Sequence, residues 1–343
     1  MPPTMEDVAR RAGVSKATVS LVLNKKSGIS PETEHAVLRA VEELGYRLPE
    51  RRPLRSPASR TLTILYHVEN ELRTEPYGVV PGFLRGARTF AREANVHLTI
   101  LAGYRREDLE QIGTHFLDSE GLLPEGLILM GPGLCRDSAS VVQALKRNIP
   151  AVVLCRNWPD VPVSTVGHDH YEQARIALDH LIQLGHRTIA FLARKGDERY
   201  DWYQRRLECY RKVAAEPDGE VDEDLIVLAK DRAGALKTLM MRRPDVTAIF
   251  ANHDAKAIEA MQGLRQMGLR VPEDVSVIGQ DDARQAPEGF PGLTTVHFSH
   301  FEVGYLAAEL LLRQIENDEV VQGNIWVRSY LVERDSCCRA RPV

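Results

Sequence analysis

The sequence predicts a small all-α helix-turn-helix domain followed by a larger α/β domain of two lobes, each a parallel sheet with helices on both faces. Two observations predict this. Short helical segments with polar caps fill residues 4–45, and from residue 61 onward short β-rich runs alternate with helical stretches. Apolar runs that alternate with helices are typical of parallel sheets covered on both faces. About 275 residues of this alternation exceed one ordinary α/β core, so two lobes are expected.

Three short helices are expected in the head. Thr4 can cap the first, Gly13 permits the turn after it, Ser15 can cap the second, and Ser30 can cap the third with Pro31 at its first helical position. The apolar spacing predicts an inner face made of Val8, Ala9, Ala12, Val19, Val22, Leu23, Val37, Ala40, Val41 and Leu44.

Residues 47–60, RLPERRPLRSPASR, contain three prolines and five arginines with almost no apolar periodicity, which indicates a linker. Beyond it, strands are expected at 61–68, 96–101, 126–130, 151–155, 188–193, 247–252 and 274–279, and helices at 79–94, 170–184, 203–215 and 254–267. The expected domains are the head at 1–46, the linker at 47–60, the two-lobed body at 61–335 (lobe one about 61–160 and 297–319, lobe two about 161–296 and 320–335) and a tail at 336–343. Open α/β sheets bind ligands at the carboxyl ends of their strands, so a pocket is expected there.

Charge is distributed unevenly along the chain. Residues 1–60 hold 11 Lys and Arg and 7 Asp and Glu, a net +4, while the whole chain carries −4, so the body carries −8. A basic head on an acidic body indicates that the head meets a polyanion.

The chain contains neither a run of roughly 18 apolar residues, as a membrane span needs, nor the apolar core of a signal peptide in MPPTMEDVARR. A cytoplasmic location is therefore expected. Five cysteines without metal-type spacing are expected to be free thiols there. Cys337-Cys338 lies in a short polar tail that is expected to be disordered or incidental.

The arrangement of the expected helices in the head is typical of a helix-turn-helix DNA-binding domain. Its second helix follows the first after a tight glycine turn, and hydroxyl side chains gather at the helix starts. Helix N-termini offer unpaired N–H groups to phosphates, and side chains at the start of the second helix can reach base edges in the major groove. The alternative is a small helical bundle used only for packing.

Longer stretches carry a resemblance to a known family. MEDVARRAGVSKATVSLVLN and SPETEHAVLRAVEELGY in the head, and GHRTIAFLA, RLECYRKV, VPEDVSVIGQDD and LTTVHFSHFEVG in the body, resemble the lactose-repressor (LacI/GalR) family of bacterial transcription regulators. The resemblance implies a sequence-specific regulator, most simply a repressor, that binds a near-palindromic DNA operator as a homodimer. It further implies control by a small-molecule effector, a sugar or sugar derivative, held between two lobes like those of periplasmic sugar-binding proteins, with no cofactor.

The resemblance also implies roles for residues of the head. It places Lys16 and Ala17 at base edges, where Lys16 could donate to a guanine and Ala17 could touch a thymine methyl. The residues that it places at phosphates are Ser15, Thr18, Ser20, Asn24, Ser30 and Thr33. One position departs from the family, because Leu21 stands where Arg is usual, and a direct guanine contact is put in doubt.

The linker departs further from the family pattern, in which a hinge helix wedges a Leu into the minor groove. Leu54 is the candidate wedge, but Pro53 and Pro57 flank it, and proline inside a helix costs about 3 kcal/mol. A regular hinge helix is therefore not expected. The linker arginines Arg51, Arg52 and Arg55 could follow the DNA backbone or the minor groove instead, and a solvated tether is the alternative.

For the body, the resemblance implies an effector site just past the strands or at helix starts. The implied contacts are Tyr77, Arg156, Arg206, His253, Asp254 and Asp281. A carboxylate accepts hydroxyl hydrogen bonds, a guanidinium donates in a rigid fork, and an aromatic face such as that of Tyr77 or Trp158 packs the apolar side of a sugar ring.

Each of these roles has a structural alternative. Arg206 and Asp281 could pair with each other across the cleft, Asp254 could cap the helix that follows it, and Trp158 could anchor its loop. His253 and Gln280 depart from the residues that the family usually has there, which predicts a more polar pocket and puts the identity of the ligand in doubt.

His168-Asp169-His170 has the look of a metal site, but no third ligand is spaced nearby, so no metal is expected and Asp169 is expected to cap a helix. No GxSxG, HExxH, P-loop, CxxC or strand-linked GxGxxG motif is present, so no enzyme is expected. Two alternatives remain: a solute-receptor-like protein without a DNA role, and a regulator of the same kind that responds to a non-sugar ligand such as a nucleobase.

Overall fold

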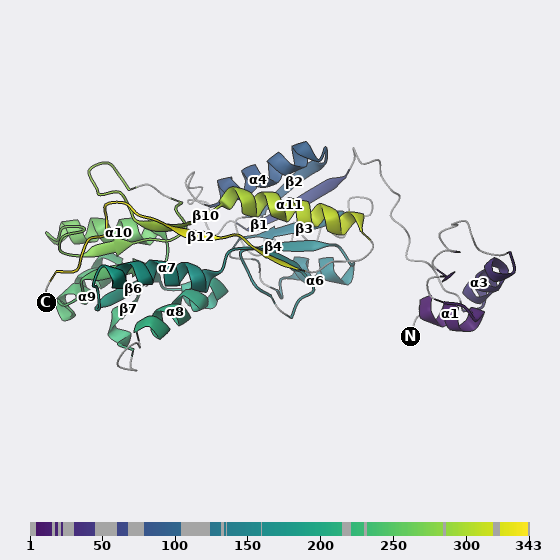
Figure 1. Cartoon of the computed structure of the whole chain (residues 1–343), viewed down its shortest axis with the longest axis horizontal. Helices are drawn as coiled ribbons and strands as arrows, with labels where there is room; N and C mark the ends of the chain where they lie inside the picture. The colour runs from purple at the N-terminus through teal and green to yellow at the C-terminus, as the bar shows by residue number, and fades with distance from the viewer. Residues whose placement is uncertain are drawn as a thin grey trace. The chain divides into compact units, whose positions relative to one another are not determined.

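The computed structural model describes residues 5–15, 18–19, 22, 31–44, 60–67, 79–103, 124–131, 134, 136–158, 160–214, 221–229, 232–283, 286–317 and 323–341. The chain divides into two compact units, Met1–Ser56 and Pro57–Val343, so the division falls within the expected linker. Figure 1 labels the helices and strands of each unit.

The first unit is helical. Its helices α1 (Met5–Ala12) and α3 (Pro31–Leu44) pack together, and residues 18, 19 and 22 between them are also helical. Its core consists of Val8, Ala9, Val19, Val22, Val37 and Ala40, each at most 6% exposed, with Ala12, Val41 and Leu44 against it. The inner face expected from the apolar spacing is thus confirmed at these positions, and Leu23 lies outside the described residues.

Lobe one of the second unit is built on a parallel sheet with strand order β11-β5-β4-β3-β1-β2. The strands are β1 (Thr61–His67), β2 (His97–Gly103), β3 (Gly126–Met130), β4 (Ala151–Leu154), β5 (Ser164–Gly167) and β11 (Asn324–Trp326). The helices of this lobe are α4 (Val80–Glu93), α6 (Ala139–Lys146) and α11 (His300–Glu316). The central strands β3, β4 and β5 are buried along their whole length, as a sheet covered on both faces requires.

Lobe two contains the parallel sheet β7-β6-β8-β9. Its strands are β6 (Ile189–Arg194), β7 (Ile226–Ala229), β8 (Ala248–Ala251) and β9 (Ser276–Ile278). Its helices are α7 (His170–Gln183), η3 (Asp197–Arg199), α8 (Asp201–Ala214), η4 (Glu223–Leu225), α9 (Arg232–Arg242) and α10 (Asp254–Gln266). A separate antiparallel pair, β10 (Thr295–Phe298) with β12 (Ser329–Val332), lies beside this sheet.

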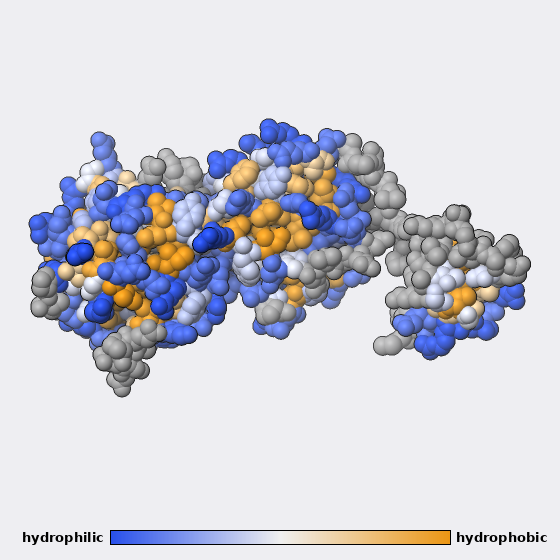
Figure 2. Space-filling model, in the orientation of Figure 1, coloured by the Kyte–Doolittle hydropathy of each residue, from blue (hydrophilic) through white to orange (hydrophobic). Residues whose placement is uncertain are grey.

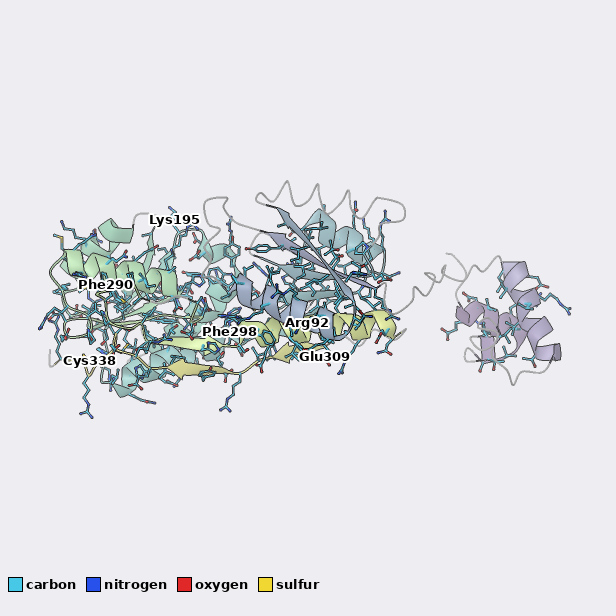
Figure 3. The ribbon with its side chains drawn as sticks, turned by 90° about the horizontal axis from the view of Figure 1, so that it is seen from above. Arg92, Lys195, Phe290, Phe298, Glu309 and Cys338 are labelled. Carbon is cyan, nitrogen blue, oxygen red and sulfur yellow. The ribbon has the colours of Figure 1, made fainter. Side chains whose placement is uncertain are left out.

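Three chain segments join the lobes: β5 to α7, β10 to α11, and β11 to β12. Figure 3 shows Phe298, the last residue of β10, at the place where the lobes meet. The lobe boundaries differ from those expected, because β5 and β11 pair within the sheet of lobe one although residues 161–167 and 324–326 were expected in lobe two.

The tail also differs from its expectation. Ser336 is fully buried, its carbonyl oxygen accepts from the Val277 N–H at 2.8 Å, and its hydroxyl donates to the Val277 carbonyl at 2.6 Å. Residues 336–338 therefore continue lobe two along the edge of β9 instead of forming a disordered tail. Four of the five cysteines lie in the described part of the chain, and all four are free thiols: Cys155, Cys209, Cys337 and Cys338.

In lobe one, helices α4 and α11 cross at close range. A Cβ atom on Gly304 would collide with the Phe83 carbonyl oxygen, and one on Gly86 would collide with the Phe301 carbonyl oxygen. The two helix backbones approach this closely because glycine stands at both crossing points. His300, at the start of α11, is thereby fixed relative to α4.

Candidate functional site

The centre of the candidate site is Arg206, a charged side chain on α8 that is 1% exposed. Its Nη2 donates to Asp281 Oδ1 at 2.8 Å and to Gln173 Oε1 at 2.6 Å, and its Nη1 donates to the Asn252 carbonyl oxygen. Arg206 and Asp281 thus form an ion pair, as in the structural alternative to a ligand contact. Both residues belong to lobe two, however, so the pair does not span the lobes.

Asp281 follows β9 in a strained backbone conformation, with φ at 92°. Its own N–H donates to the Val296 carbonyl at 2.9 Å, which holds the loop against β10. His253 Nδ1 lies 3.1 Å from Asp281 Oδ2. Burial pushes the pKa of Asp281 upward, but the Arg206 charge and the His253 hydrogen bond together outweigh it and hold that pKa well below its usual value. Asp281 is therefore ionised, and His253 Nδ1 lies within reach of both Asp281 Oδ2 and Arg206 Nη1, the latter at 3.3 Å.

Asp254 supports this loop from the start of α10. Its Oδ2 accepts from the Ala283 N–H at 2.7 Å and its Oδ1 accepts from the Thr295 hydroxyl at 2.6 Å. The side chain is only 2% exposed. The carboxylate thus joins the loop after β9 to β10.

Lobe one contributes residues that follow β4. Arg156 Nη1 lies 3.4 Å from Asp201 Oδ1, and the Asn157 N–H donates to Asp201 Oδ2 at 3.3 Å. The guanidinium also lies 5.5 Å from the ring centre of Tyr200. Since Asp201 is the first residue of α8, these contacts cross from lobe one to lobe two. Trp158 packs in the core of lobe one, which is the anchoring alternative.

The histidines near position 168 sit at the junction of the lobes. His168 stacks on Phe298 with ring centres 3.6 Å apart, and His170 Nε2 lies 3.0 Å from the Cys155 carbonyl oxygen. Asp169 accepts from the N–H groups of Tyr171 and Glu172, so its expected role as the cap of α7 is confirmed. Within the described ranges, no group of His, Cys, Asp and Glu is arranged to hold a metal ion.

Buried polar atoms without partners gather around Arg206 and Asp281. They are Arg206 Nε, Asn252 Nδ2 and Oδ1, Gln280 Oε1, His168 Nδ1 and Nε2, His170 Nδ1 and His300 Nε2. Leaving such an atom unsatisfied costs about 1–3 kcal/mol. This concentration of unmet hydrogen-bonding capacity fits a cleft that takes up a polar ligand.

Two residues that accept hydrogen bonds from Arg206 were not predicted from the sequence. Asn252 follows β8 immediately, in the position where ligand contacts were sought. Gln173 shares the buried face of α7 with Ala177 and Leu181, at positions i, i+4 and i+8, so a polar residue within an apolar stripe was the available signal.

A separate cavity of about 430 Å³ lies elsewhere in lobe two, lined in part by Ile189, Tyr210 and Arg243. Ile189 begins β6, whereas the Arg206 cluster is at the carboxyl ends of the strands. Arg243 is already held by Asp222 and Asp245. The cavity is therefore distinct from the cluster and lacks its unmet polar atoms.

In the head, the structure describes three of the residues expected at DNA. The Ser15 hydroxyl accepts from the Thr18 N–H at 3.1 Å, so its role as a cap is confirmed, and it also lies 2.8 Å from the Thr18 hydroxyl. Thr33 lies half-buried in the first turns of α3. The remaining expected contacts, Lys16, Ala17, Ser20, Asn24, Ser30 and Leu54 at DNA and Tyr77 at the effector, lie outside the described residues.

Comparison with known proteins identifies both parts of the chain. Residues 4–48 match the model of bacterial regulatory proteins of the lacI family, and residues 178–337 match a periplasmic binding protein-like domain. The HTH-type transcriptional regulator CelR of Thermobifida fusca is 32% identical over 97% of this chain and 98% of its own length. The chain belongs to the LacI family. Like its relatives, this LacI-family member is a DNA-binding transcriptional regulator under ligand control.

Further relatives extend the comparison. The HTH-type transcriptional repressor PurR of Haemophilus influenzae (strain PittEE) is 28% identical over 93% of each chain. Among solved structures, a CelR–cellobiose complex has a TM-score of 0.70 at 30% identity and covers 97% of this chain and 99% of its own. A lac repressor dimer bound to operator and the anti-inducer ONPF has a TM-score of 0.66 at 26% identity and covers 98% and 100%. No helix in the described part of this LacI-family chain combines the length and apolarity of a membrane span.

Proposed function

We propose that this LacI-family regulator is a homodimeric repressor whose affinity for a near-palindromic operator is controlled by a sugar or sugar derivative bound at the Arg206–Asp281 cluster. The observation that carries the proposal is the set of unpartnered buried polar atoms around that cluster. Because sugar hydroxyls both donate and accept, they can satisfy donors such as Arg206 Nε and acceptors such as Gln280 Oε1 at once.

Aromatic side chains next to Arg206 support a ring-shaped ligand. The Trp202 ring lies 4.7 Å from the ring of His253 and 5.2 Å from that of Tyr200. Such faces pack the apolar side of a sugar ring. Cellobiose, which the related CelR structure holds, is the first candidate effector. The expected contacts Tyr77, Arg156, Arg206, His253, Asp254 and Asp281 are part of this proposal.

The head supports the DNA-binding role through its basic charge and its hydroxyl-rich helix starts. We assign contacts with base edges to Lys16 and Ala17, and a contact in the minor groove to Leu54. The assigned phosphate contacts are Ser15, Thr18, Ser20, Asn24, Ser30 and Thr33. Since the operator is chromosomal DNA, we place the protein in the cytoplasm, where it binds its effector without transforming it.

Apolar surface on lobe one supports the homodimer. Figure 2 shows hydrophobic residues at the surface over α11 and α4. On β2, an edge strand of the sheet, Ile100 is 46% exposed. A dimer that buries these faces brings two heads to one operator, and ligand binding changes operator affinity by its difference in affinity for the two states, typically about 1–3 kcal/mol.

The proposal is tested by gel-shift titration of the full chain on the DNA upstream of its own gene, with random duplex as competitor. We expect preferential binding that cellobiose shifts. Lys16→Ala should weaken operator binding by about 1–3 kcal/mol while leaving random DNA nearly unaffected. Equal losses on both DNAs would show that Lys16 contacts phosphate only.

A thermal-shift screen distinguishes the second candidate effector class. A nucleobase effector is favoured by the planar aromatic faces of Trp202 and Tyr200, which stack on bases as well as on sugars. Stabilisation by a purine or pyrimidine nucleobase, with none by cellobiose or other sugars, would reject the sugar and leave the regulator role intact.

A further inference from the structure

Three histidines next to Arg206 and Asp281 carry ring nitrogens that are buried and have no partner. His168 follows β5, His170 begins α7 and His300 begins α11, so the three come from two of the segments that join the lobes. The unpartnered atoms are both ring nitrogens of His168, Nδ1 of His170 and Nε2 of His300. The rings are in contact, because His168 lies 4.3 Å from His170 and both His168 and His300 pack on Phe298.

The hydrogen-bond partners of two of these rings decide what they offer to a ligand. His170 Nε2 faces the carbonyl oxygen of Cys155, which can only accept, so the proton is on Nε2 and Nδ1 presents a lone pair. His300 hydrogen-bonds the backbone of Asp281, and this bond favours the protonated ring, so a carbonyl accepts from it and Nε2 presents a lone pair. Both free nitrogens are therefore acceptors.

Burial keeps these rings neutral. It lowers the pKa of His170 to about 3, and the nearby charge of Arg206 adds to the effect. Burial likewise lowers the pKa values of His168 and His300 below their usual value. At neutral pH the three rings therefore bring no positive charge to the cleft.

The arginines of the cleft are already neutralised. Arg206 is held by Asp281, and Arg156 by Asp201. Because each of these two arginines is paired with its own carboxylate, neither brings a net positive charge to an anionic ligand, which would also face the lone pairs of His170 and His300. A hydroxyl, in contrast, can donate to each lone pair without bringing charge into a buried site.

We propose that His168, His170 and His300 are specificity-determining residues of the effector site, which accept hydrogen bonds from hydroxyls of an uncharged sugar and reject its phosphorylated or oxidised forms. This inference rests on the proposed sugar-binding function of the cleft. It narrows the effector from sugars and sugar derivatives in general to neutral sugars.

The test is isothermal titration of the full-length protein with cellobiose, with cellobionate, its carboxylate-bearing oxidised form, and with cellobiose 6′-phosphate. We expect cellobiose to bind at least about a hundredfold more tightly than either anion, because each would place a buried charge beside acceptors. His170→Leu and His300→Leu should each weaken cellobiose binding about tenfold or more.

Conservative variants separate hydrogen bonding from packing. His170→Asn places an amide oxygen where Nδ1 was, and His300→Gln does so for Nε2, so each should recover most of the affinity that its Leu variant loses. His180→Leu is the matched control. His180 is a buried histidine further along α7, and its replacement should leave the affinity unchanged.

The outcomes are distinguishable. Tighter binding of either anion than of cellobiose would overturn this inference while the cleft stays a sugar site. Cellobiose affinity that is unchanged in both folded Leu variants would also overturn it. If the wild-type protein bound none of the three ligands, the proposed sugar effector would fail together with the inference.

Discussion

At the scale of single residues, Asp254 shows how a buried carboxylate supports the site through another segment. Its two oxygens accept from Ala283 and Thr295, so Asp254→Asn turns one acceptor into a donor that faces a donor. We expect the variant to lose about 1–3 kcal/mol of unfolding free energy, measured by urea titration. Effector binding should weaken as well, because the loop after β9, which carries Asp281, loses a hydrogen bond that holds it in place. Unchanged stability would show that the two hydrogen bonds are replaced by solvent.

A second prediction at this scale concerns pH. The pKa of His170 is about 3 in the folded protein, because burial and then Arg206 disfavour the charged ring, whereas Asp281 acts in the opposite direction. In the unfolded chain the ring has a pKa near about 6.5, so the unfolded state binds the proton first as pH falls. The contribution of His170 to stability is therefore complete above pH about 6.5 and decreases continuously toward pH about 3.

Between pH 7 and 5 this linkage amounts to about 2 kcal/mol for His170 alone. We expect wild-type stability to fall over that interval and the fall to be smaller by about this amount in His170→Asn. His97→Asn on the exposed face of β2 is the control and should keep the wild-type slope. Equal slopes in the wild type and His170→Asn would contradict the depressed pKa.

The family resemblance implied Arg156, Arg206, His253, Asp254 and Asp281 as effector contacts, and their role at the effector stays a prediction. The structure brings Arg206, His253 and Asp281 together, whereas Arg156 contacts Asp201 and Asp254 holds the loop after β9. The hydrogen-bond partners of these side chains could not be predicted, because they depend on how closely segments distant in the chain approach one another. Gln173 on α7, for instance, lies beside the loop after β9, where it accepts from Arg206 and donates to Asp281.

At the scale of secondary-structure elements, the crossing of α4 and α11 predicts a sharp steric effect. A methyl group on Gly304 meets the backbone carbonyl of Phe83, which cannot rotate away as a side chain could. Gly304→Ala should therefore cost about 1–3 kcal/mol by urea titration. Gly323→Ala is the control, since nothing lies within 4 Å of its added methyl. Equal stability of the two variants would mean that the helices separate without cost.

Elements of lobe two also show where sequence patterns stop being informative. The strands expected at 188–193 and 247–252 are β6 and β8, because long apolar runs between turn residues are unambiguous. The run around β5 is short and contains polar Ser164 and Thr165, so its place in the sheet of lobe one follows only from its pairing with β4. Likewise, Ser336 is held in lobe two by hydrogen bonds to β9, which the local sequence pattern does not predict.

At the scale of the whole body, the question is what holds the lobes in their relative position around the cleft. The Arg206–Asp281 pair does not, since it lies within lobe two. The contact of Arg156 and the Asn157 N–H with Asp201 does cross, as does the hydrogen bond from His170 to the Cys155 carbonyl. A ligand that binds more tightly when the two lobes are closed gains affinity from any contact that stabilises the closed arrangement of the lobes.

The last prediction follows from this crossing contact. The side chain of Arg156 is 10% exposed and that of Asp201 is 32% exposed, so the ion pair is only partly screened by solvent. Asp201→Asn keeps an acceptor for the Asn157 N–H but removes the charge. We therefore expect cellobiose binding to weaken about three- to tenfold, which corresponds to about 0.6–1.4 kcal/mol. If Arg156 acts on ligand binding through its pair with Asp201, Arg156→Lys should weaken binding similarly and the double variant should lose little more than either single one. Isothermal titration of the four proteins gives the coupling energy directly. Additive losses would assign the two residues separate roles and would leave the hydrogen bond from His170 to the Cys155 carbonyl as the described crossing contact that favours closure.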